Sequence, residues 1–366
     1  MRQQIRATVF ALIAFAAFAQ NSSSFQGETA LKTQFVEVQR DVKLEVLDWG
    51  GAGRNLVLLA GLGNTAHVFD SIGPKLATHY HVIGITRRGF GQSSAPQTGY
   101  DPRRLGDDVV AVLDALRITD PILVGHSIAG EELSAISTYH PGRAAALVYL
   151  DAGGPFALYN PKHGDYTPAL AQLKDDLSTL QKNLFDDWLV SKTLTDMVLF
   201  QANLAELRGE LECGTPPSPK ASDLASISAL QRYMKGYFGG IIPEAEVRQD
   251  FRIGEGGRVG EWLGHGYANQ SVMLQEERFH SLETPLLAIF SYPAAPSPSQ
   301  TSDPAKLAAC RAAETSREES QLAIFREQPH ARVIVIPNAT HYIFLSREEE
   351  VISQVYDFVN GLPAKP

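Results

Sequence analysis

The stretch Gly125-His126-Ser127-Ile128-Ala129-Gly130 directly follows the apolar run Pro121-Ile122-Leu123-Val124, and together they decide the fold. The apolar run predicts a buried strand, and the residues after it predict a sharp turn into a helix with Ser127 at its apex. Such a turn lifts the serine hydroxyl clear of the sheet, and it needs small residues two positions before and after the serine. Gly125 and Ala129 meet that requirement. The pattern is therefore typical of a nucleophile elbow.

A second segment supplies hydrogen-bond donors for the same site. An apolar strand is predicted over 55–59, and it runs into the glycine-flanked turn Ala60-Gly61-Leu62-Gly63. In such a turn the backbone N–H of Leu62 can point at a substrate oxygen, and so can the N–H of Ile128, the residue after Ser127. Each donor of an oxyanion hole stabilises a transition state by about 3 kcal/mol. We therefore expect an oxyanion hole at Leu62 and Ile128.

Two other strands also end in short loops. A strand over 81–86 leads into Arg87-Arg88-Gly89-Phe90-Gly91-Gln92-Ser93, and a strand over 332–336 ends shortly before His341. An oxyanion turn, a glycine-punctuated loop, a serine elbow and a late histidine thus follow one another along the chain. In this order of parts the sequence resembles the α/β-hydrolase superfamily over nearly everything from residue 35 to residue 362.

The resemblance implies a fold and two catalytic roles. The fold is the α/β-hydrolase fold, in which a mostly parallel sheet carries helices on both faces and the site lies at the carboxyl ends of the strands. Ser127 would be the nucleophile and His341 the general base. Two positions depart from the family pattern, because Ala60 stands where a histidine is common and Thr86 where an aspartate is common. These departures concern the subfamily and leave the expected fold unchanged.

The acid that would orient the histidine has two candidates. Asp151 follows the strand over 146–150, and some members of the superfamily, including one group of haloalkane dehalogenases, carry their acid after that strand. Asp303 is the alternative, because many members carry the acid after the strand that here covers 285–290, and Asp303 is the nearest aspartate downstream. We prefer Asp151, although an aspartate at such a position can also simply cap the following turn.

The sequence also offers a rival to His341. His126 lies next to Ser127, but adjacent side chains at an elbow point apart, so we expect His126 to line the pocket or to pack beside the sheet. His341 follows the last strand, and the stretch Ser346-Arg347-Glu348-Glu349-Glu350 after it predicts an N-cap and an acidic first turn for the last helix. This arrangement would anchor the loop of His341 on both sides.

The strand pattern is interrupted between Asp151 and Pro285 by stretches with helical character. We interpret this insertion, placed after the strand that follows the helix of Ser127, as a helical cap that roofs the pocket and selects the substrate. The predicted domain organisation is a first core part over 34–154, a cap over 155–282 and a second core part over 283–366.

The first residues predict export. Arg2 and Arg6 precede an apolar stretch over 7–18, and Ala17-Phe18-Ala19 is a small-x-small cleavage site. This pattern indicates a signal peptide over 1–19, a flexible segment over 20–33 and a secreted or periplasmic protein, and the apolar stretch is shorter than the roughly 20 residues of a stable membrane anchor. An oxidising compartment would allow Cys213 and Cys310 to pair, but two unpaired cysteines fit the sequence equally well.

Composition limits the classes of partner. The 366 residues are 44% hydrophobic and 20% charged, with a net charge of −9, so we expect a globular chain that binds neither nucleic acid nor an anionic membrane. The sequence contains no HExxH, Cys-x-x-Cys or P-loop pattern, and we therefore expect no metal and no cofactor. The oligomeric state cannot be predicted from the sequence.

The serine at the elbow favours an acyl-enzyme reaction. We predict hydrolysis of a small or medium-sized, fairly apolar carboxylic ester. Carbon–carbon bond hydrolysis, amidase or lactonase activity and haloperoxidase-like activity remain alternatives within the same fold. A ligand-binding module without turnover is an alternative of another class, because the fold alone does not establish a function.

Overall fold

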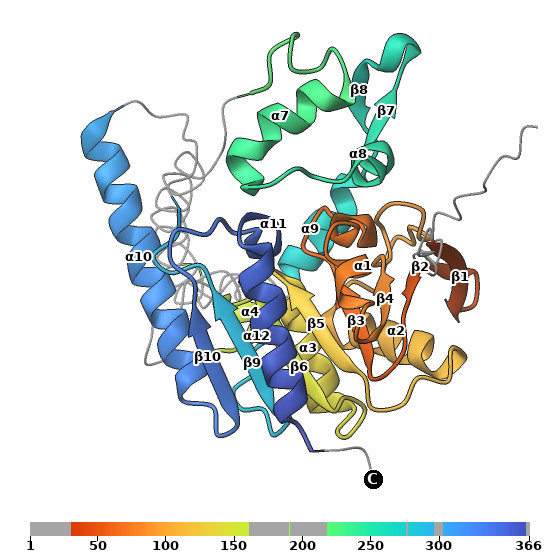
Figure 1. Cartoon of the computed structure of the whole chain (residues 1–366), viewed down its shortest axis with the longest axis vertical. Helices are drawn as coiled ribbons and strands as arrows, with labels where there is room; N and C mark the ends of the chain where they lie inside the picture. The colour runs from red at the N-terminus through yellow and green to blue at the C-terminus, as the bar shows by residue number, and fades with distance from the viewer. Residues whose placement is uncertain (1–30, 161–189, 191–217, 276, 296–302, 364–366) are drawn as a thin grey trace, which may run out of the picture.

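The structure is a computed structural model that describes residues 31–160, 190, 218–275, 277–295 and 303–363 (Figure 1). An eight-stranded sheet forms its centre. The strands of this sheet are β1 (Lys32–Gln39), β2 (Val42–Gly50), β3 (Asn55–Leu59), β4 (His81–Ile85), β5 (Ile122–His126), β6 (Ala146–Leu150), β9 (Leu286–Phe290) and β10 (Ala331–Val335).

The strand order in the sheet is β1-β2-β4-β3-β5-β6-β9-β10. β1 pairs antiparallel with β2, and β2 pairs antiparallel with β4. From β4 to the other edge all pairs are parallel. The carboxyl ends of β3, β5, β6 and β10 therefore lie at one edge of the sheet, where the predicted site residues follow them. The predicted mostly parallel sheet is confirmed.

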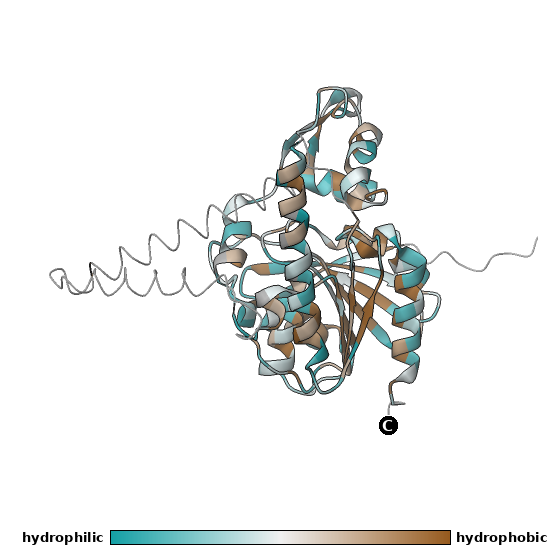
Figure 2. Cartoon of the chain, turned by 90° about the vertical axis from the view of Figure 1, so that its left-hand side faces the viewer, coloured by the Kyte–Doolittle hydropathy of each residue, from teal (hydrophilic) through white to brown (hydrophobic). Residues whose placement is uncertain are grey.

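Helices cover both faces of this sheet. The helices and 3₁₀ turns of the core are η1 (Ala66–Phe69), α1 (Gly73–Leu76), α2 (Pro102–Ala115), α3 (Ala129–Tyr139), α4 (Gly154–Ala157), α10 (Pro304–Arg326), α11 (Ile343–Ser346) and α12 (Glu348–Gly361). Alternate residues of a strand point to opposite faces, so Leu56 and Leu58 of β3 pack with α1 and α12, whereas Val57 and Leu59 pack with α2, α3 and α10. Figure 2 shows this arrangement as brown strands between the two helical layers.

The chain between β6 and β9 forms a separate group of elements above the carboxyl edge of the sheet (Figure 1). After α4, its described elements are α7 (Ile227–Phe238), α8 (Glu244–Asp250), β7 (Phe251–Ile253), η3 (Glu255–Gly257), β8 (Val259–Trp262) and α9 (Gly266–Leu274). The insertion lies where the cap is predicted, but it is not purely helical, because β7 and β8 form an antiparallel pair. These strands are too short for a detectable alternation in the sequence. Residues 161–189 and 191–217 of the predicted cap lie outside the described residues.

The structure describes only part of the N-terminal segment and of the two cysteines. β1 begins at Lys32, two residues before the predicted start of the core. Residues 1–30 lie outside the described part, so the signal peptide stays a prediction. Cys213 and the side chain of Cys310 also lie outside the described part, so the two alternatives for their pairing stay predictions. Among the described residues, none of the helices combines the length and the apolar character that crossing a membrane requires.

Candidate active site

Ser127 lies at the turn between β5 and α3, as its sequence context predicts. Its φ angle is 55°, in the left-handed region that non-glycine residues rarely adopt. The N–H of Ser127 donates to the carbonyl of Leu150 on β6, at 3.2 Å, and this bond ties the turn to the sheet. A Cβ atom at Gly125 would lie only 3.0 Å from the side chain of Leu133. This close approach leaves little room for a side chain where the new helix folds back over the strand.

The structure brings together the three side chains that the sequence selects for a triad. The Nε2 atom of His341 is 2.9 Å from the Oγ atom of Ser127, and its Nδ1 atom is 2.8 Å from the Oδ2 atom of Asp151. The His341 side chain is 43% exposed, whereas that of Asp151 is only 15% exposed. His341 is thus open to solvent and Ser127 is partly exposed, while the carboxylate lies behind the imidazole.

The Asp151 carboxylate is held by Ser291, a residue that the sequence reasoning missed. The backbone N–H of Ser291 donates to Oδ1 and its hydroxyl donates to Oδ2, each at 2.9 Å. Ser291 directly follows β9, the strand beside β6 in the sheet. A serine after a buried strand is the only sequence signal for this contact, and it is too common to be specific.

Asp303, the alternative acid, occupies a different kind of position. Its side chain caps the N-terminus of α10, where it accepts a hydrogen bond from the N–H of Ala305 at 2.9 Å. The partner of the His341 ring is Asp151 instead. The sequence could not separate these roles, because Asp303 precedes Pro304 in a stretch that is equally typical of an N-cap.

His126 packs behind the site. It is 1% exposed, and its Nε2–H donates to the backbone carbonyl of His341 at 3.0 Å. Burial, together with the nearby His341 ring, lowers the pKa of His126 well below its ordinary value, so this imidazole stays neutral. This agrees with the expectation that His126 packs beside the sheet, and it gives His126 a part in holding the loop of His341.

The loop of His341 is also anchored from its other side, although not in the predicted way. The last helix α12 begins after Arg347, and Ser346 belongs to the preceding helix α11. The Ser346 hydroxyl instead accepts a hydrogen bond from the N–H of Thr340 at 3.1 Å. The Thr340 hydroxyl donates to the carbonyl of Phe238 on α7, at 2.8 Å. The loop is thereby tied to both the last helices and the cap.

The predicted oxyanion turn lies against the elbow. A Cβ atom at Gly61 would lie 3.2 Å from the Cβ atom of Ser127 and 2.8 Å from the Nδ1 atom of His126, so only glycine fits there. Within the described residues, neither the N–H of Leu62 nor the N–H of Ile128 donates to a backbone carbonyl. Both groups are therefore available to a substrate oxygen near Ser127.

A cavity of about 310 Å³ opens beside His341 and Asp151. Its described walls combine aromatic side chains with polar side chains of α10, namely Phe156, Tyr237, Phe290, Glu314, Glu318 and Gln321. Its volume is within the range of pockets that hold small ligands. The two carboxylates and the amide that α10 contributes make this wall of the cavity polar.

A carboxylate from the cap, Glu246 of α8, reaches the segment after the oxyanion turn. Its side chain is fully buried, and it accepts hydrogen bonds from the Asn64 amide at 2.9 Å, from the Thr65 N–H at 3.0 Å and from the Thr65 hydroxyl. Burial raises the pKa of Glu246 to about 7. Asp250, on the same helix, has its pKa raised as well, by burial and by the charge of Glu246.

This shift predicts a pH dependence of stability. Because the pKa of Glu246 is higher in the folded chain than in the unfolded chain, its contribution is complete below about pH 4.5 and is lost as the pH rises towards about 7. We expect Glu246→Gln to flatten the decline in the free energy of unfolding over this pH range, as measured by urea unfolding. An equally steep decline in both proteins would contradict the assignment.

Among the described residues, no three His, Cys, Asp or Glu side chains are grouped so that they could hold a metal ion. The chemistry that the geometry allows is that of a serine next to an imidazole, with the imidazole held by a carboxylate and two backbone N–H groups nearby.

Comparison with known proteins points to one family. The sequence profile of the alpha/beta hydrolase family matches residues 56–354. A non-heme chloroperoxidase of Streptomyces lividans is 32% identical over 124 residues, which are 33% of this chain and 45% of that protein. The bifunctional epoxide hydrolase 2 of Rattus norvegicus is 25% identical over 224 residues, which are 56% of this chain and 39% of that protein. The chain thus spans less than half of the length of these relatives.

A solved structure agrees over a longer stretch. The esterase EaEST from Exiguobacterium antarcticum superposes with a TM-score of 0.56, at 17% identity, over 90% of this chain and 100% of that chain. This likeness shows the fold. Because the family profile covers most of the sequence and the sheet is mostly parallel as predicted, we conclude that this chain belongs to the alpha/beta hydrolase family.

Proposed function

We propose that this protein is a serine hydrolase that cleaves a small or medium-sized carboxylic ester through an acyl-enzyme intermediate. The observation that carries the proposal is the chain of contacts from Ser127 through His341 to Asp151, with distances of 2.9 and 2.8 Å. This is the arrangement that activates a serine hydroxyl in nucleophilic catalysis.

In the proposed reaction, the Oγ atom of Ser127 attacks the ester carbonyl carbon and its proton moves to Nε2 of His341. Asp151 keeps the proton of Nδ1 in place and stabilises the imidazolium that forms. The carbonyl electron pair becomes an oxyanion that accepts hydrogen bonds from the N–H groups of Leu62 and Ile128. When the tetrahedral intermediate collapses, the Nε2 proton passes to the leaving alcohol, and Ser127 carries the acyl group.

The second half of the reaction repeats these roles with water. A water molecule gives a proton to Nε2 of His341 and attacks the acyl carbon, and the oxyanion again forms beside Leu62 and Ile128. Collapse releases the carboxylic acid and returns the proton to Ser127. Ester cleavage needs no redox partner, so these residues are sufficient for both halves.

A panel of neutral p-nitrophenyl esters with increasing acyl length tests this proposal. We expect turnover with an initial burst of p-nitrophenol, and an acyl adduct on Ser127 in the intact mass of the quenched protein. Amides, lactones and 1,3-diketones belong in the same panel, because the alternatives within this fold act on such bonds. Turnover of one of those classes without ester cleavage would favour that alternative, and tight binding without any turnover would favour a ligand-binding module.

The cavity predicts a preference with respect to charge. Glu314 is among the residues that line the cavity, so a substrate that carries its own carboxylate should be repelled by about 1 kcal/mol, or about fivefold in kcat/KM. We expect Glu314→Gln to raise kcat/KM for an ester with a free carboxylate severalfold and to leave a neutral ester of the same size nearly unchanged. Glu319→Gln is the matched control, because this exposed residue of α10 bonds to Tyr292 and does not line the cavity. Equal effects of both changes would contradict the prediction.

A further inference from the structure

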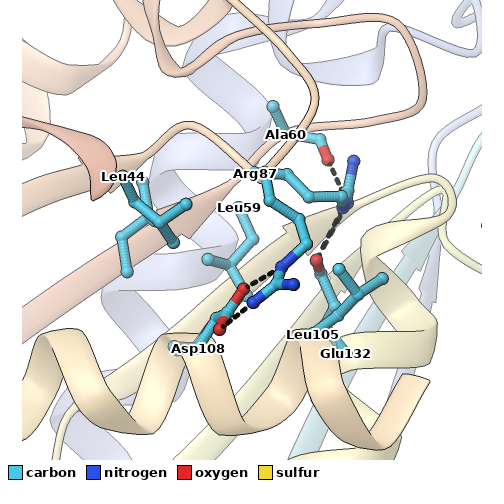
Figure 3. A pocket seen from close by; sticks show the side chains of 10 residues that line it. Leu44, Leu59, Ala60, Arg87, Leu105, Asp108 and Glu132 are labelled. Atoms are coloured by element: carbon cyan, nitrogen blue, oxygen red, sulfur yellow. Dashed lines mark hydrogen bonds and ion pairs between the residues drawn. The ribbon is translucent and has the colours of Figure 1, made fainter. Parts of the chain in front are cut away.

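Two buried arginines follow β4, and each is held by a carboxylate from a neighbouring helix (Figure 3). Arg87 pairs with Glu132 of α3, and their side chains are 5% and 4% exposed. Arg88 pairs with Asp108 of α2, and their side chains are 1% and 3% exposed. The cavity between these pairs measures about 10 Å³, which is room for about one water molecule, so it is not a ligand site.

The two arginines differ in what else they bind. Arg87 donates two hydrogen bonds to the Glu132 carboxylate, from Nε at 2.6 Å and from Nη2 at 2.9 Å. Its guanidinium also donates to the carbonyl of Ala60 at 2.9 Å and to that of Gly61 at 3.4 Å. Arg88, in contrast, donates to the carbonyl of Thr98 and to the side chain of Gln39, and both lie outside the oxyanion turn.

The carbonyl that Arg87 binds at Gly61 shares a peptide unit with the N–H of Leu62. In a trans peptide these two groups point in opposite directions, so a donor that fixes the carbonyl also fixes the direction of the N–H. The Gly61 carbonyl receives a second hydrogen bond from the N–H of Asn64, at 3.2 Å. The Leu62 N–H is thereby turned away from Arg87, and the turn itself lies within contact distance of Ser127.

The other donor of the oxyanion hole is connected to the same ion pair. Glu132 lies in the first turn of α3, which begins at Ala129, directly after Ile128. We propose that Arg87, held in place by its ion pair with Glu132, is a positioning residue. It orients the N–H groups of Leu62 and Ile128 so that both can donate a hydrogen bond to the oxyanion. This inference rests on the proposed function, because it concerns the transition state of that reaction.

The placement of Arg87 determines which kinetic constant should change. The Arg87 side chain is only 5% exposed and lies behind the oxyanion turn, so its replacement should leave substrate binding unchanged. Removal of an oxyanion donor lowers kcat by about 100- to 1,000-fold in known hydrolases. A donor that is present but poorly aimed should cost less, about 10- to 100-fold in kcat with little change in KM.

The test uses two variants and a control. Arg87→Lys keeps the charge that Glu132 needs, but the lysine lacks the planar fork that reaches both carbonyls. The double variant Arg87→Met with Glu132→Leu removes the ion pair without leaving a buried charge unpaired. The control double variant, Arg88→Met with Asp108→Leu, removes the neighbouring buried pair that does not bind the turn.

Each protein is assayed with a matched pair of inhibitors, a trifluoromethyl ketone and the corresponding methyl ketone. Ser127 adds to the trifluoromethyl ketone: Oγ bonds to the carbonyl carbon, its proton moves to His341, and the carbonyl electron pair becomes an oxyanion in the hole. We expect both Arg87 variants to lose affinity for the trifluoromethyl ketone by the same factor as kcat, and to bind the methyl ketone as the wild type does. The control variant should retain both affinities.

Unchanged affinity of the Arg87 variants for the trifluoromethyl ketone would overturn this inference. An equal loss in the control variant would also overturn it, because the effect would then reflect any buried ion pair near β4. A wild-type chain that binds the two ketones equally would contradict the proposed function, and this inference would fall with it.

Discussion

Replacement of Ser127 by alanine is expected to lower kcat for the best ester of the panel by about a million-fold, to the level of background catalysis. The change removes the only atom that can form the acyl bond, while the cavity and the oxyanion turn stay in place. We therefore expect KM or ligand affinity to change little, and the free energy of unfolding to stay within about 1 kcal/mol of the wild type. Initial rates and urea unfolding measure the two effects.

A serine on α3, the helix that follows Ser127, provides the control for this experiment. Ser137 of α3 bonds to the hydroxyl of Thr284 at 2.8 Å and takes no part in the site. Ser137→Ala should retain full activity. Residual turnover by Ser127→Ala within about tenfold of the wild type would show that the reaction does not pass through this serine.

Replacement of Asp151 by asparagine is expected to lower kcat by about 10,000-fold. The amide preserves the shape of the side chain but offers an N–H where the Nδ1–H of His341 needs an acceptor. The imidazole is then held in the wrong tautomer, and the charge that stabilises the imidazolium is lost. The hydrogen bonds from Ser291 to this side chain make it rigid, so the error cannot be relieved by a simple rotation.

Asp303→Asn is the matched control, because it makes the same chemical change at the other candidate acid. Asparagine is as good an N-cap as aspartate, so α10 should remain intact and kcat should stay within about twofold of the wild type. Equal tolerance of both substitutions would contradict the role proposed for Asp151, and greater damage from the change at Asp303 would reverse the assignment.

The features that the sequence could predict are local ones. Gly125, Ser127 and Ala129 define the elbow within five residues, because the turn is tight enough to restrict which side chains fit. Asp151 and His341 could be proposed because each follows a recognisable apolar strand, and the ends of neighbouring parallel strands meet at one edge of the sheet. In the structure, His341 contacts both Ser127 and Asp151, the residues that we preferred from the sequence.

The features that the sequence could not predict depend on contacts between distant segments. Glu246 lies in the cap and bonds to Asn64 and Thr65, which are more than 180 residues away. In the sequence, Arg87 is simply part of a polar loop. Only the fold shows that its guanidinium donates to the carbonyl of Gly61 and to Glu132 of α3. The short strands β7 and β8 could not be predicted for another reason. They have three and four residues, which are too few to show an alternation of apolar and polar side chains.

The most direct test of the central claim, an activated serine at position 127, is the intact mass of the protein after treatment with a fluorophosphonate. The reagent phosphonylates a serine only when a neighbouring base removes its proton and fluoride can leave. The account predicts a single adduct on the wild-type chain and none on Ser127→Ala. An unmodified wild-type chain, or the same adduct on both proteins, would contradict it.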